Sequence, residues 1–144
     1  MSVSHILGVK GRSVITSSPH ESVHATAQKL SQNRIGAVVV VNEKGGIAGI
    51  VSERDIVRAL AENGAAAMTQ PVSGIMSKTV KTCKFGDSEI ELMALMTTHR
   101  IRHLPVVDGG ALAGMISIGD IVKFRIEAIE REAEDMKSYI ASAG

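Results

Sequence analysis

Two short apolar runs, each rich in β-branched residues, divide the chain into similar halves. Residues 37–41 and 104–107 are too short for a helix and are predicted to be buried strands. A glycine-containing turn joins each run to a second apolar segment, 47–51 or 112–116, so each pair is predicted to form a β-hairpin. Helices are expected over 22–33 and 88–99, and again after Ser52 and Ser117. With short strands at 14–16 and 80–82, each half is predicted to be a β-α-β-β-α unit.

The two halves also match in sequence. Residues 33–41 align with 99–107 at an offset of 66, and residues 48–57 align with 113–122 at an offset of 65. Both copies end in Ser-x-x-Asp-Ile-Val, and residues 3–7 resemble residues 72–76, which precede the second copy. The chain is therefore a tandem duplication with mixed α/β units. Because a small sheet cannot cover both of its faces alone, we expect the copies to pack sheet to sheet about a pseudo-twofold axis.

The helix predicted over residues 88–99 has apolar residues at helical spacing. Ile90, Met93, Leu95 and Met96 are expected to form its buried face. Asp87 precedes this helix, where its side chain is expected to act as the N-cap.

The last helix is predicted to continue to about residue 140, far beyond its counterpart in the first copy. Its apolar residues recur at spacings of four and three: Val122, Ile126, Ile129, Ala133, Met136 and Ile140. This spacing is typical of a helix that packs along another helix. Since a small monomer has little with which to cover the whole stripe, we expect a homodimer. The alternative is that the stripe folds back onto its own domain.

Composition narrows the classes of function. Two Phe, one Tyr and no Trp give no platform on which the bases of single-stranded nucleic acid could stack. The net charge of +1 and the absence of a Lys/Arg run also argue against a nucleic-acid partner. The single cysteine, Cys83, excludes an internal disulfide and indicates a reducing compartment. It could be a reactive thiol or a small strand residue, and no pattern around it suggests activation.

The sequence shows no sign of targeting or of catalysis. No signal-peptide pattern opens the chain and the longest apolar run is too short to span a membrane, so we expect a cytoplasmic protein without a membrane partner. His99 and His103 are four residues apart, but the interval crosses a predicted helix–strand junction and no further ligand joins them. We therefore expect no metal site. No nucleophile–base pairing or phosphate-binding loop is apparent, so an enzyme is not expected.

Two motifs then connect the chain to a known family. His-Arg-Ile-Arg-His-Leu-Pro-Val-Val-Asp at 99–108 and Gly-Met-Ile-Ser-Ile-Gly-Asp-Ile-Val at 114–122, in this order of elements, resemble a tandem pair of CBS domains, or Bateman module, of the small free-standing bacterial type. The resemblance covers residues 3 to about 124. It divides the chain into repeat 1 with its N-terminal lead-in (1–62), a linker with a lead-in helix (63–78), repeat 2 (79–124) and a C-terminal helical extension (125–144).

The resemblance implies a non-enzymatic sensor that binds an adenosine-containing ligand in clefts between the repeats. AMP is expected first, with ATP or NAD(H) as alternatives. The family motif ends in Ser/Thr-x-x-Asp, in which the Asp holds the ribose hydroxyls and the Ser/Thr lies near ribose or phosphate. By position, these residues are Ser52 with Asp55 and Ser117 with Asp120. A carboxylate can accept hydrogen bonds from both hydroxyls, at roughly 1.5–3 kcal/mol each. The alternative is that the serines are N-caps and the aspartates complement the helix dipole.

The resemblance also implies that each cleft draws on both repeats. One set of predicted ligand-binding residues comprises Ser117 and Asp120 with Thr16, Ile35, Gly36 and Ala37. The other comprises Ser52, Arg54 and Asp55 with Thr82, Ile101, Arg102 and His103. The cationic residues suit phosphate, and the alternative is that they are ordinary surface residues.

The two predicted clefts differ in size and charge. The small Gly36 and Ala37 leave room for an adenine, so ribose is expected to bind best at Asp120. Residues 10–12 could reach a phosphate, but a flexible loop is expected there. The regulated partner cannot be named from the sequence. A structural dimerisation module with no physiological nucleotide remains the competing function.

Overall fold

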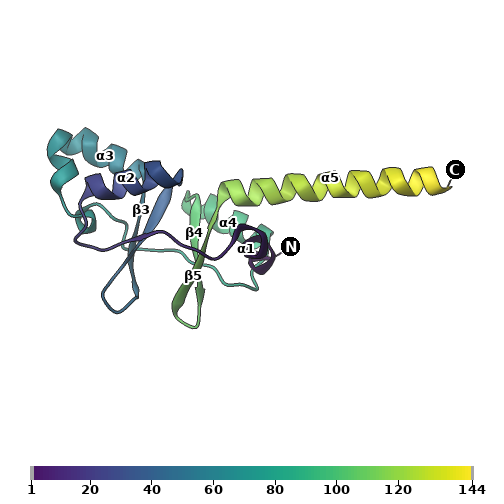
Figure 1. Cartoon of the computed structure of the whole chain (residues 1–144), viewed down its shortest axis with the longest axis horizontal. Helices are drawn as coiled ribbons and strands as arrows, with labels where there is room; N and C mark the ends of the chain where they lie inside the picture. The colour runs from purple at the N-terminus through teal and green to yellow at the C-terminus, as the bar shows by residue number, and fades with distance from the viewer. Residues whose placement is uncertain (1, 144) are drawn as a thin grey trace.

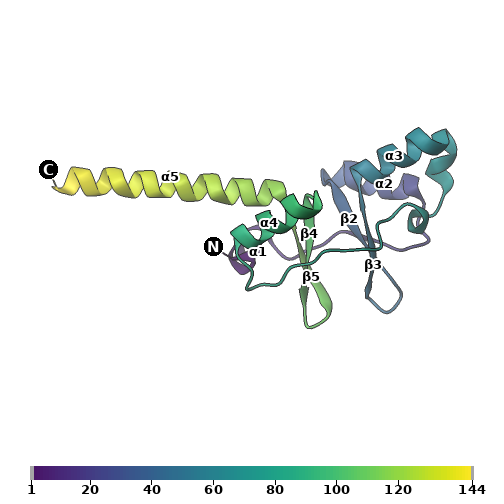
Figure 2. The same ribbon diagram turned by 180° about the vertical axis from the view of Figure 1, so that it is seen from behind.

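The computed structural model describes residues 2–143, in which two α/β repeats stand side by side with their hairpins pointing the same way (Figures 1 and 2). Repeat 1 consists of β1 (Thr16–Ser17), α2 (Val23–Asn33), β2 (Ala37–Val41), β3 (Ile47–Ser52) and α3 (Glu53–Asn63). Two 3-10 segments, η1 (Gly64–Thr69) and η2 (Val72–Gly74), lead to repeat 2, which consists of α4 (Glu89–His99), β4 (His103–Asp108), β5 (Ala111–Ser117) and α5 (Ile118–Ala143). The N-terminal helix α1 spans Val3–Lys10. The predicted fold class is confirmed.

The first strand of each repeat differs from its prediction. In repeat 1 the strand is Thr16–Ser17 instead of 14–16, with Ser17 buried and paired to Val40. In repeat 2, residues 80–82 form no strand, and Cys83 alone makes a parallel bridge to Val106. The reason is Pro105, which occupies the position of Val39. The next rung of the ladder would need an N–H from residue 105, and proline has none.

Cys83 itself is a core residue. It is a free, buried cysteine that packs with the apolar residues of repeat 2. Burial, together with the nearby charge of Asp87, raises the pKa of its thiol to about 12. A thiol that stays protonated is a poor nucleophile, so the structural interpretation of Cys83 holds.

The lead-in segments are exchanged between the repeats. Val3, Ile6 and Leu7 of α1 belong to the core of repeat 2, whereas Val72, Ile75 and Met76, before repeat 2, pack in the core of repeat 1. Glycines at equivalent positions of the two repeats leave space for side chains of these lead-in segments. A Cβ atom on Gly114 would lie 2.7 Å from Leu7 Cδ1, and one on Gly49 would lie 2.6 Å from Met76 Sδ. Each repeat is therefore completed by the segment that precedes the other.

Two expectations for α4 are wrong in detail. Its N-cap is Ser88, whose side chain accepts a hydrogen bond from the Glu91 N–H, while Asp87 accepts from the Lys84 N–H in the turn before. Its buried face carries Leu92 and Met96, whereas Ile90 and Met93 are exposed. The apolar residues of α4 extend around the helix, and only one side of it lies on the core.

Helix α5 extends away from both repeats as a single rod (Figure 1). Ile121 and Phe124 in its first two turns are buried against repeat 2, and every residue from 129 to 143 is exposed. The apolar stripe is exposed as well, with Ile129 at 52%, Met136 at 64% and Ile140 at 67%. The stripe does not fold back onto its own domain, so that alternative is wrong. Nothing in residues 2–143 forms a helix long and apolar enough to cross a bilayer.

Candidate functional site

Helix α3 begins with a reciprocal cap that positions Asp55. The Ser52 side chain accepts from the Asp55 N–H, and Asp55 Oδ2 accepts from the Ser52 N–H at 2.9 Å. Asp55 Oδ1 lies 3.4 Å from Arg58 Nη1, one turn further along the same helix. The capping interpretation of this Ser-x-x-Asp motif is therefore correct, and it does not exclude a second role for the carboxylate.

Helix α5 begins with the same cap but with a different cation. Asp120 Oδ2 accepts from the Ser117 N–H at 2.8 Å, and the Asp120 N–H donates to Ser117 Oγ at 3.1 Å. Lys10 Nζ, at the end of α1, donates to the same Oδ2 at 2.6 Å and to the Met115 carbonyl at 2.7 Å. Burial alone would raise the pKa of Asp120, but the hydrogen bonds from Lys10 and Ser117 outweigh it and hold that pKa below its ordinary value.

The expected flexible loop around Lys10 is therefore not observed. Lys10 lies in the last turn of α1, and the Arg12 guanidinium lies 4.6 Å from the centre of the Phe85 ring. Both contacts join the N-terminal segment to repeat 2.

A cavity of about 400 Å³ lies between the repeats beside Asp55. Most of the predicted ligand-binding residues line it: Gly36, Ala37, Ser52, Arg54, Asp55, Ile101, Arg102 and His103. Gly36 and Ala37 were expected opposite Asp120, and here they share a cavity with Asp55. The volume is in the range of small-molecule sites.

The cavity is rich in positive charge. Its cationic residues are Arg54, Arg58, Lys81, Arg100 and Arg102, against the two carboxylates of Glu53 and Asp55. Burial lowers the pKa of His103, and the nearby Lys10 lowers it further, against the opposing effect of Asp120 and Glu53. His103 is therefore neutral near pH 7 and can donate or accept a hydrogen bond. A cavity with this balance favours an anion that also carries hydroxyl groups.

His103 also explains why residue 36 is a glycine. A Cβ atom there would lie 3.0 Å from His103 Cε1 and 3.1 Å from His103 Nε2. The imidazole of repeat 2 therefore rests directly on bare backbone of repeat 1, at the wall of the cavity.

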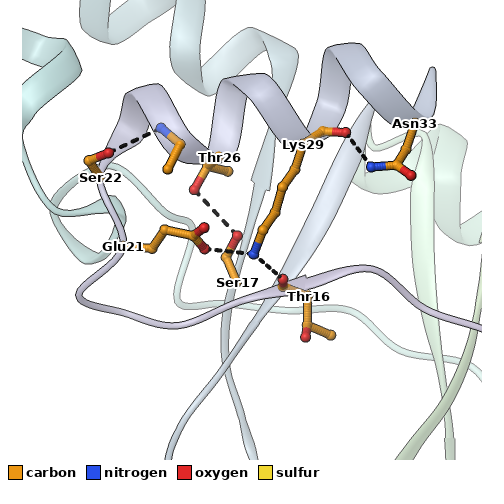
Figure 3. A network of polar contacts seen from close by, with 8 residues as sticks. Thr16, Ser17, Glu21, Ser22, Thr26, Lys29 and Asn33 are labelled. Atoms are coloured by element: carbon orange, nitrogen blue, oxygen red, sulfur yellow. Dashed lines mark hydrogen bonds and ion pairs between the residues drawn. The ribbon is translucent and has the colours of Figure 1, made fainter.

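The other predicted residues lie outside this lining. Ser117 and Asp120 form the α5 cap, Ile35 packs on the core of repeat 1, and Thr82 is exposed. Thr16 is in β1, where its carbonyl accepts from Lys29 Nζ at 2.8 Å (Figure 3). Lys29 in turn contacts Glu21 Oε2 at 2.9 Å, so the Thr16 backbone is held by α2.

Several residues of the cavity escaped the sequence analysis. Val80 and Lys81 line it from the predicted strand 80–82, and Ser77 and Thr79 line it from the residues just before that strand. Arg58 and Arg100, with Lys81, are the additional cations. Arg100 ends α4 in the left-handed conformation, with φ 53°. Its equivalent, Arg34, ends α2 with φ 52° but does not line the cavity. The Arg58 position, one turn after Asp55, was the one addition that helical spacing could have revealed.

No metal site accompanies this geometry in the described part of the chain. Residues 2–143 contain no group of three or more His, Cys, Asp or Glu side chains arranged to hold an ion.

The structure thus defines a class of duplicated α/β module whose two repeats exchange their lead-in segments and enclose a cavity. The family model for the CBS domain matches the chain twice, over residues 6–62 and 72–127, and the chain belongs to this family. A solved CBS-domain-containing protein from Agrobacterium tumefaciens is 46% identical and superposes with a TM-score of 0.84, covering 86% of this chain and 92% of that chain. The protein is thus a CBS-pair regulatory module.

Two other similar structures were solved with adenosine-containing ligands. A CBS domain protein from Pyrobaculum aerophilum, complexed with AMP, is 28% identical with a TM-score of 0.75, covering 83% of this chain and 89% of that chain. A CBS domain pair in complex with 5′-methylthioadenosine and S-adenosyl-L-methionine is 26% identical with a TM-score of 0.80, covering 89% of this chain and 98% of that chain. The ligands of these two CBS proteins thus share an adenosine.

Proposed function

We propose that the protein is a non-enzymatic sensor that binds an adenine nucleotide in the cavity beside Asp55, with AMP as the first candidate and ATP or NAD(H) as alternatives. The observation that carries this proposal is a single cavity in which a capped aspartate faces cations from both repeats. The AMP complex of a similar CBS protein supports the same ligand class.

The chemistry divides the cavity into two parts. Asp55 is suited to accept hydrogen bonds from the two ribose hydroxyls, because capping occupies Oδ2 while Oδ1 contacts only the exposed end of Arg58 at 3.4 Å. Arg102 and Arg100 reach the cavity from repeat 2, and a guanidinium can hold two phosphate oxygens at once. A nucleotide bound in this way would join the repeats, so binding would change their relative geometry or rigidity.

Binding is tested by thermal unfolding and calorimetry with AMP, ADP, ATP, NAD, NADH and S-adenosylmethionine. A true ligand at ~100 times its dissociation constant should stabilise the chain by about 2.7 kcal/mol. Adenosine and 2′,3′-dideoxy-AMP separate the contributions of phosphate and ribose. No stabilisation by any of the six compounds would contradict the proposal.

Two equivalent arginines provide a matched pair of variants. Arg100→Gly should weaken nucleotide binding about tenfold, as expected for the loss of one charge-assisted hydrogen bond. Arg34→Gly changes the same cap position in repeat 1, away from the cavity, and should leave affinity unchanged. Equal effects of the two substitutions would show that phosphate is not bound at Arg100.

We also propose that the protein is a cytoplasmic homodimer that regulates a partner protein, held together through the CBS repeats and α5. The exposed apolar stripe of α5 supports the dimer. The same stripe favours the competing function of a structural dimerisation module. A stable dimer that binds none of the six compounds would support that alternative.

A further inference from the structure

Helix α5 carries a second pattern beside its apolar stripe. The stripe fits a seven-residue repeat in which Ile126, Ala133 and Ile140 occupy the a positions and Val122, Ile129 and Met136 the d positions. At 3.6 residues per turn, this stripe is centred about 130° around the helix from Ile121 and Phe124, which pack on repeat 2. The helix therefore has one face for its own domain near its start and a separate face, exposed along its whole length, for a partner.

The charges that flank the stripe are complementary in one orientation only. The g positions preceding Ile126 and Ala133 are Arg125 and Glu132, and the e positions following Ile129 and Met136 are Glu130 and Lys137. In two parallel helices in register, each g residue lies beside the e residue five positions later in the other helix. Arg125 then faces Glu130, and Glu132 faces Lys137, so both pairs are attractive.

Antiparallel packing of the same stripe gives the opposite result. With a positions facing d positions, Ile126 lies opposite Met136 and e residues face e residues. Lys123 would then lie beside Lys137, and Glu130 beside Glu130 of the other copy. Glu132 would likewise face its own equivalent. Each of these pairs has like charges, which destabilise helix contacts.

We infer that the C-terminal helices of two copies form a parallel, in-register, two-stranded coiled coil along the Val122–Ile140 stripe. This inference rests on the proposed homodimer and specifies its orientation and the residues that set it. Arg125 Nη1 also lies 3.3 Å from Glu89 Oε1 within its own chain. The pair between the exposed Glu132 and Lys137 has no such competing contact within residues 2–143 and therefore determines the helix orientation more clearly. In this arrangement both α5 starts, with their Lys10–Asp120 contacts, lie at the same end of the coil.

Charge reversal distinguishes the orientations. In the parallel coil, Lys137→Glu makes two attractive pairs repulsive and should raise the dimer dissociation constant about tenfold, as measured by sedimentation equilibrium. Adding Glu132→Lys to the same chain should restore the wild-type value. In the antiparallel coil, Lys137→Glu would instead relieve the contact with Lys123 and strengthen the dimer, which would overturn the inference.

Disulfide trapping provides an independent test on the full chain. Ile126→Cys and Ala133→Cys should each give a covalent dimer on oxidation, because parallel pairing places each residue beside its own copy within disulfide reach. Cys83 is buried, so the unsubstituted chain serves as the control and should stay uncrosslinked. A dimer that neither variant crosslinks, or that only Ala133→Cys crosslinks, would overturn parallel pairing while leaving the homodimer in place. A chain that stays monomeric at all concentrations would overturn both the homodimer and the parallel coiled coil. It would leave the proposal of nucleotide binding in place.

Discussion

The starts of α3 and α5 are built from the same four-residue motif, but different parts of the chain hold their aspartates. Asp55 is paired within its own helix, with Arg58, and borders a cavity between the repeats. Asp120 is paired with Lys10, which lies 110 residues earlier and also bonds to the Met115 carbonyl. The duplicated motif thus provides the same cap twice, whereas the surroundings assign one aspartate to a cavity and the other to a contact between distant segments.

This difference follows from the exchange of lead-in segments. Helix α1 ends in Lys10 and packs on repeat 2 through Leu7, which lies against Gly114. This packing brings the ammonium group of Lys10 to the start of α5. At the equivalent point in repeat 1, Met76 sits over Gly49, and the next residues, including Ser77 and Thr79, line the cavity. A cation therefore lies beside Asp120, whereas a ligand-sized cavity lies beside Asp55.

The largest effect on stability is expected from adding a methyl group at Gly49 or Gly114, the glycines on which the lead-in side chains pack. Gly49→Ala and Gly114→Ala should each destabilise the chain by about 1–3 kcal/mol through overpacking, as measured by urea unfolding. Gly49→Ala should cost more, because its Cβ would lie 2.8 Å from the Ser77 carbonyl oxygen as well as meeting Met76, whereas Gly114 meets only the end of the Leu7 side chain.

Gly8→Ala provides the control for those substitutions. Gly8 lies in α1, and a Cβ atom added to it would have no neighbouring atom within 4 Å, so alanine should stabilise the helix by roughly 0.5–1 kcal/mol. If Gly49→Ala and Gly114→Ala left the unfolding free energy unchanged, the close approach of the lead-ins would not be needed for stability.

The next largest effect concerns the aspartates. Asp120→Ala should cost about 1–2 kcal/mol in unfolding free energy, because it removes the cap and leaves Lys10 beside the Met115 carbonyl without its carboxylate. Asp55→Ala should cost about 1 kcal/mol, since Arg58 is largely exposed and turns to solvent.

Asparagine separates capping from charge at the same positions. Asp120→Asn and Asp55→Asn keep an oxygen that can accept from the serine N–H. Asn should therefore recover most of the stability at residue 55 but less at residue 120. Equal recovery at both positions would show that Lys10 contributes nothing specific.

Particular residues show how far the sequence could predict this arrangement. The internal repeat predicted both Ser-x-x-Asp motifs and both hairpins, because each depends on local pattern and on duplication. The opposition of Ser52 and Asp55 to Arg102 and His103 was implied only by the resemblance to the CBS family, because local pattern does not determine how the repeats pack. Lys10 could not be assigned, because its partner is set by which repeat α1 packs on. Arg100 could not be assigned either, since its direction depends on a left-handed backbone at the end of α4. The missing strand at 80–82 was predictable in principle from Pro105.

The smallest effect is expected from the Lys10–Asp120 pair alone, and its pH dependence identifies it. Lys10→Met should cost no more than about 1 kcal/mol at pH 7, as for a partly exposed ion pair. The pKa of Asp120 in the folded chain lies below the ordinary 3.8, so the carboxylate contributes stability that is fully present above pH 3.8 and lost as the pH falls through the lowered value. The difference between wild type and Lys10→Met should therefore be constant from pH 5 to 7 and shrink below pH 4. Urea unfolding at pH 3, 4, 5 and 7 measures it, with Arg58→Met as the control for an exposed pair. A difference that stayed constant down to pH 3 would mean that Lys10 stabilises the fold by packing and not through the Asp120 carboxylate.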